Sequence, residues 1–116
     1  MNKLVKFPIF IALFSSMTLF AQNSLTTQTP DGADIFESKG CSVCHDTQME
    51  RIAPSLQYIA TMYQGDENAL VTFLKGEKSA IVQPESASVM QPQLMKIKSL
   101  YEDEIRALAR YIVENR

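Results

Sequence analysis

The feature that most constrains this chain is the pentapeptide CSVCH, which occupies residues 41–45 and contains both cysteines and the only histidine. Thiolate and imidazole are the side-chain groups that bind soft metals most readily. Their confinement to five positions of a 116-residue chain indicates a single compact site. Any fold for this chain must therefore be built around that site.

Three familiar uses of such a motif each leave part of it unexplained. A disulfide between Cys41 and Cys44 would close a very short loop and would stabilise the fold only weakly. A thioredoxin-like redox pair requires a strand before the motif, whereas the preceding residues ADIFESKG contain no β-branched run. A closed structural zinc site needs four ligands, and cysteine and histidine together supply three here.

The fourth use accounts for all three side chains. In a C-x-x-C-H motif the two thiols attach covalently to the vinyl groups of a haem, and the imidazole binds the iron. One turn of chain between the sulfurs suits the two vinyl positions and brings the next residue under the iron. We therefore interpret Cys41 and Cys44 as the attachment points of one haem c, and His45 as an axial ligand.

The N-terminal segment is typical of a secretory signal peptide. Lys3 and Lys6 precede an apolar run over residues 7–20, and Ala21 stands before a polar stretch. We expect a signal peptide over residues 1–21, a polar linker over 22–30 and one domain over 31–116 that works in the periplasm. An uncleaved segment would instead anchor the protein in the membrane.

Charge and composition exclude other classes of function. Removing the signal peptide leaves nine basic and thirteen acidic residues, a formal net charge of −4. Nucleic-acid binding needs a clustered basic surface, which is absent from the sequence. There is also no spare histidine, no cysteine outside the motif and no acid pair in a defined frame. We therefore expect neither an enzyme nor a protein that binds a small-molecule substrate.

Periodic apolar residues predict an all-α domain. Helices are expected over residues 31–39, 54–65, 66–76 and 101–114, the last with acidic residues in its first turn. Its predicted buried stripe is Ile105, Leu108, Ala109 and Ile112. Residues 77–100 contain two prolines and no sustained period, so we expect them to form largely a loop that covers the face of the haem opposite His45.

The second axial ligand cannot be a histidine of this chain, because His45 is the only one. The remaining choices are methionine, lysine, water or an open position, and of these methionine suits a haem that transfers electrons. Met90 and Met95 both lie in the 77–100 segment, and Met95 has an alternative role in packing. Pro92 favours Met90, because it stiffens the chain and should hold Gln91 in extended geometry.

Four stretches of the sequence resemble the class I c-type cytochromes of bacteria. They are DIFESKGCSVCH, APSL, VMQPQL and the closing EDEIRALARYIVE. The resemblance implies a small all-α cytochrome c-like fold around one covalent haem, with Met90 as the sixth ligand. It also implies that the Pro54 carbonyl accepts a hydrogen bond from His45 Nδ1. Two positions depart from the family pattern: Ala53 replaces a glycine, and Tyr101 replaces a serine or threonine helix cap.

The same resemblance implies that the last helix crosses the first, with Phe36 and Gly40 near Tyr111 and Ala107. Arg51, Tyr58 and Tyr63 are candidate partners of the haem propionates.

The expected function is that of an exported monohaem cytochrome, with His45 and Met90 on the iron, that carries single electrons between redox proteins. Its donor and acceptor are expected to be membrane respiratory complexes. The acidic net charge would favour a basic docking patch on the partner. The alternative is a haem c subunit, or a ligand-binding or sensor domain, of a larger oxidase or dehydrogenase complex.

Overall fold

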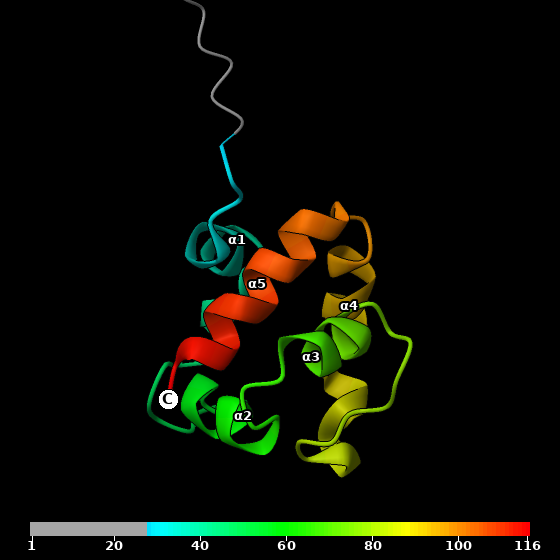
Figure 1. The fold of residues 1–116 in the computed structure, drawn as a ribbon. Coiled ribbons are helices and arrows are strands. Elements are labelled where there is room, and N and C mark those ends of the chain that lie inside the picture. Colours follow the sequence, from blue (N-terminus) through cyan, green and yellow to red (C-terminus); the bar gives the residue numbers. More distant parts are fainter. Residues whose placement is uncertain (1–27) are drawn as a thin grey trace, which may run out of the picture.

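The computed structural model describes residues 28–116, so the predicted signal peptide and most of the predicted linker lie outside the described residues. Residues 28–116 form helices and no strand, which confirms the all-α prediction (Figure 1). None of the helices in this range has the length and apolar character needed to cross a membrane. The elements are α1 (Gly32–Ser38), the 3₁₀ helix η1 (Cys41–Val43), α2 (Leu56–Met62), α3 (Glu67–Leu74), the 3₁₀ helix η2 (Pro84–Met90), α4 (Gln91–Ile97) and α5 (Glu102–Glu114).

The first three α-helices each begin at a side chain that accepts hydrogen bonds from the first turn. Asp31, Ser55 and Asp66 accept backbone N–H groups of α1, α2 and α3 at 2.8, 3.1 and 3.0 Å. Helix α5 begins differently, because the Glu104 carboxylate accepts the N–H of Tyr101 at 2.8 Å. The replacement of a serine or threonine by Tyr101 therefore leaves this helix with a side-chain contact at its start.

Helix α5 organises the fold, because α1, α2 and α3 all pack against it (Figure 1). Its predicted stripe is buried as expected, and Val113 extends it. Leu108 and Ala109 are fully buried at the centre of this packing. Burying such apolar surface supplies the main driving force for the helices to associate.

The crossing of α1 and α5 takes place at Gly32. A methyl group on Gly32 would collide with the Ala107 carbonyl oxygen and lie 2.6 Å from Tyr111 Cβ. The Phe36 and Tyr111 rings meet as predicted, with centroids 5.5 Å apart. The predicted role of Gly40 is wrong, because a Cβ there would meet no atom within 4 Å. Gly40 instead supplies the left-handed turn, with φ +75°, that separates α1 from η1.

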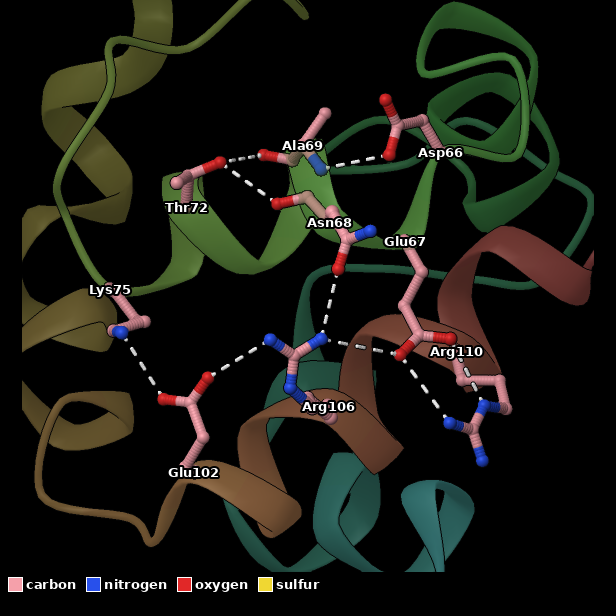
Figure 2. Close-up of polar contacts among 9 residues, drawn as sticks. All are labelled: Asp66, Glu67, Asn68, Ala69, Thr72, Lys75, Glu102, Arg106 and Arg110. Carbon is pink, nitrogen blue, oxygen red and sulfur yellow. Dashed lines mark hydrogen bonds and ion pairs between the residues drawn. The ribbon is translucent and has the colours of Figure 1, made fainter.

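A chain of ion pairs joins α3 to α5 on the surface (Figure 2). Arg110 Nε donates to Glu67 Oε2 at 3.0 Å, and Arg106 is 3.3 Å from Glu102. Glu102 also pairs with Lys75 at 3.1 Å. Exposed pairs of this kind add little stability individually. Here they neutralise three basic side chains on this face of the molecule: Lys75, Arg106 and Arg110.

The expectation that residues 77–100 are largely loop is wrong for residues 84–97, which form η2 and α4. Both prolines lie in the first turn of a helix. The N–H groups of that turn have no partner within the helix, so the missing N–H of proline costs no helical hydrogen bond. Gln91 is accordingly helical, with φ −54° and ψ −46°, and the predicted extended geometry is also wrong. Leu94 and Ile97 are buried, so α4 is held to the core by these two side chains.

Candidate haem-binding site

The helices enclose one large apolar cavity of about 590 Å³. It is lined by side chains from every helix of the described chain, including Phe36, Leu56, Phe73, Leu74, Ile97 and Leu108. Interiors of folded domains are normally close-packed, so a cavity of this size leaves the core incomplete. The shape and lining are those of a site for an apolar group of considerable size.

The CSVCH motif forms one wall of this cavity. Its turn closes by hydrogen bonds from the N–H groups of Cys44 and His45 to the Cys41 carbonyl, at 3.2 and 2.9 Å. Both cysteines are partly buried, form no disulfide and line the cavity. Burial raises the pKa of the Cys41 thiol, so it remains protonated near neutral pH. The structure thus offers two intact thiols to one side of the cavity.

His45 is buried, and its ring is fixed by a backbone carbonyl. Its Nδ1 lies 2.6 Å from Pro54 O, which is the contact that the resemblance implies. A carbonyl oxygen can only accept, so the proton is on Nδ1 and the lone pair of Nε2 is available to a metal. The loop that carries Pro54 is itself anchored, because Ala53 N–H donates to Cys44 O at 3.1 Å.

Asp46 stabilises the turn that follows His45. Its Oδ1 accepts the backbone N–H groups of Gln48 and Met49, both at 2.9 Å. These two hydrogen bonds to the ionised form lower the pKa of the Asp46 carboxyl below its usual value. The carboxylate thus helps to shape the loop between His45 and Pro54.

The structure separates the two candidate methionines. Met90 ends η2, packs against the hydrophobic core and lines the same cavity as His45. Met95 is 67% exposed and does not line this cavity; it lines a smaller, adjacent hollow of about 410 Å³. Met49 and Met62, the other methionines among residues 28–116, do not line the cavity.

The sequence did not predict several polar residues that line the cavity, notably Gln83 and Gln93. Of the three predicted propionate partners, Tyr63 lines the cavity, whereas Arg51 and Tyr58 do not. Burial raises the pKa of Tyr63, so its hydroxyl remains a hydrogen-bond donor. Gln83 has a left-handed backbone with φ +43°, a conformation that no local sequence pattern predicts.

The donor set fits haem c better than the alternatives. Two unbridged thiols and one imidazole with a free Nε2 face a large apolar space, as covalent attachment and iron ligation require. Nowhere in residues 28–116 do three cysteine, histidine or acidic side chains converge to hold an isolated metal ion. The geometry therefore favours haem over zinc.

The chain belongs to the cytochrome c family, because residues 30–116 match the family model for cytochrome c. It is a class I c-type cytochrome, in agreement with the resemblance, and it binds haem c covalently through the C-x-x-C-H motif. Members of the family typically transfer electrons through the haem iron and are not enzymes. No curated protein matches the chain.

Proposed function

We propose that this protein is an exported monohaem carrier of single electrons whose iron is held between His45 and Met90. The observation that carries the proposal is that these two side chains line one apolar cavity, whereas Met95 does not. The bound haem would supply an iron that alternates between the ferric and ferrous states.

The protein residues would control the environment of that iron. The Pro54 carbonyl holds the His45 ring in one orientation and increases the basicity of its Nε2. Apolar side chains exclude water and keep the local dielectric constant low. A thioether from Met90 would favour the ferrous state, because it is a soft ligand.

We also propose that the protein works in the periplasm, between membrane respiratory complexes. Lys3, Lys6 and the apolar run that follows support export. Mass analysis of the mature protein should give Gln22 as the N-terminus. An intact segment over residues 1–21 would indicate a membrane-anchored cytochrome.

The ligand assignment is tested by comparing Met90→Ala with Met95→Ala in the holoprotein. Met90→Ala should abolish the weak sulfur-to-ferric-iron charge-transfer band at the red end of the spectrum and lower the reduction potential. It should also allow the ferrous protein to bind carbon monoxide. Met95→Ala is the matched control and should keep both the band and the resistance to carbon monoxide.

The reverse pattern would transfer the assignment to Met95. Rapid binding of carbon monoxide by the wild-type protein would indicate an open sixth position, as in a sensor domain, and would contradict the proposed carrier.

A further inference from the structure

The hollow beside the haem cavity is a second concave space in the described part of the chain. It lies between the C-terminal end of α3, residues 77–80, and the helices η2 and α4. Its volume of about 410 Å³ is within the usual range of small-molecule sites. Phe73, Ala80 and Ala87 line both spaces and form the wall between them. A ligand in the hollow would therefore be one layer of side chains away from the haem cavity.

The basic side chains of this hollow are not neutralised. Lys78 and Lys98 both line it, and neither forms a salt bridge within residues 28–116. The one acidic residue of the lining, Glu77, pairs with Lys75 at 3.3 Å. Lys75 is shared, because it also pairs with Glu102 (Figure 2). Two positive charges and one negative charge leave the lining with a formal charge that a single anionic group would balance.

Lys98 is held at the hollow by a close contact with the backbone. Its Cε and Nζ lie over Gly76, where an added Cβ would be 2.5 and 2.8 Å from them. Gly76 follows the C-terminal end of α3, whose partial negative charge attracts an ammonium group. Lys98 would therefore lose little conformational freedom on binding an anion, which favours affinity.

The rest of the lining has an apolar part and a polar part. Phe73, Leu94 and Met95 offer apolar surface, whereas Ser79 and Gln91 offer hydrogen-bonding groups. Met95 is 67% exposed, so a ligand with an apolar body would remove some of this surface from water. An inorganic anion would leave the apolar part uncovered. The combination suits an organic anion.

We propose that this hollow binds a small organic monocarboxylate, whose carboxylate pairs with Lys78 and Lys98 and whose apolar body covers Phe73 and Met95. The ligand would act as an effector and would not be transformed. The site goes beyond the proposed carrier function, whereas its effect on the iron rests on that function. Ferric haem carries one more positive charge than ferrous haem, so a nearby anion should bind the ferric protein more tightly. By linkage, the same anion should lower the reduction potential.

Benzoate is a suitable probe for the holoprotein. Calorimetric titration of the ferric protein should give a Kd of about 1 mM, as expected for so small a ligand. Benzamide lacks the charge and acetate lacks the ring, so each should bind at least about tenfold more weakly. Equal binding of the three compounds, or no binding of benzoate, would overturn the proposal.

The methionine methyl groups report where benzoate binds. In NMR spectra of the ferrous protein, benzoate should shift the Met95 methyl resonance. It should leave the Met49 resonance unchanged, because Met49 is similarly exposed but lines neither space. A shift at Met49 without one at Met95 would place the ligand elsewhere and overturn the assignment.

Matched charge removals test the two lysines. Lys78→Gln combined with Lys98→Gln should weaken benzoate binding by about tenfold or more. Arg51→Gln combined with Arg116→Gln makes the same change in total charge outside the hollow and should keep the wild-type affinity. An unchanged charge-transfer band verifies that each variant is folded. Equal weakening by the two double variants would show that only net charge matters.

Redox titration tests the link to the iron. A threefold preference of benzoate for the ferric protein corresponds to a potential lower by about 28 mV, because tenfold corresponds to about 59 mV for one electron. The Lys78→Gln/Lys98→Gln variant should show no such shift. Binding of benzoate without a shift would overturn the link and keep the site. A holoprotein without a reversible iron couple would instead overturn the electron-carrier function.

Discussion

The two sides of the haem cavity are built in different ways. On the histidine side, hydrogen bonds to backbone carbonyls join Cys41, His45 and Pro54 over a short stretch of sequence, one from the His45 backbone and one from its ring. On the methionine side, η2 and α4 are two short consecutive helices. Leu94 and Ile97 are the buried side chains of α4.

This difference shows where the fold depends on its cofactor. The histidine side follows directly from α1 and is fastened to α5 through Phe36 and the Gly32 crossing. The methionine side closes over a cavity that the polypeptide does not fill. A group bound only in the folded state stabilises that state by mass action. The methionine side should therefore be the part that haem stabilises most.

The largest expected effect comes from preventing haem attachment. The Cys41→Ala/Cys44→Ala protein should lose most of its helical circular dichroism, because its cavity stays unfilled. Residual hydrogen-exchange protection should remain in α1 and α5 and be absent from residues 84–97. A haem stain on a denaturing gel, positive for the wild type and negative for the variant, verifies the loss of attachment. If the haem-free variant has native helicity and unfolds cooperatively, the methionine side does not depend on haem as proposed.

A smaller effect is expected at the crossing of α1 and α5. Gly32→Ala would press a methyl group against the Ala107 carbonyl and should destabilise the holoprotein by about 1–3 kcal/mol, as overpacking usually does. Denaturant unfolding measures this change. Ala33→Ser, at the next position of α1, serves as the control. In the Gly32→Ala holoprotein the charge-transfer band should persist until the whole protein unfolds. Loss of the band at a lower denaturant concentration would mean that the histidine and methionine sides of the cavity are not independent.

The smallest effect concerns the pH dependence contributed by Asp46. Its pKa is lowered in the folded protein, so it stabilises the fold above the pKa of the unfolded chain. That contribution is lost as the pH falls through the folded-state pKa. Asp46→Ala should therefore lower Tm at pH 7, and the difference from the wild type should vanish in acid. Glu50→Ala, in the same exposed loop, is the control, and a difference that persists in acid would contradict this origin.

Much of the framework was predictable because its causes are local. The CSVCH spacing identified the haem attachment site, and caps such as Asp31 and Asp66 marked helix starts within one residue. The apolar stripe of α5 predicted its buried face because the helix is long enough to show a period.

The parts that could not be predicted depend on tertiary contacts. Pro84 and Pro92 resemble loop residues until their places in the first turns of η2 and α4 are known. The sequence does not show which of Gly32 and Gly40 lies at the helix crossing, because only the close approach of α5 to Gly32 distinguishes their roles. Lys39 and Lys96 both line the cavity but lie 57 positions apart in the sequence, so no motif could predict that they come together.

The hydrogen bond from His45 to the Pro54 carbonyl has a consequence for how such a protein can change. The acceptor belongs to the backbone, so no side-chain replacement removes it directly. Its length and angle can be adjusted only by altering the path of the loop over residues 46–54. Natural variation in this one contact should therefore arise through insertions, deletions or turn residues in the loop. A conventional alanine scan would leave this control of the site undetected.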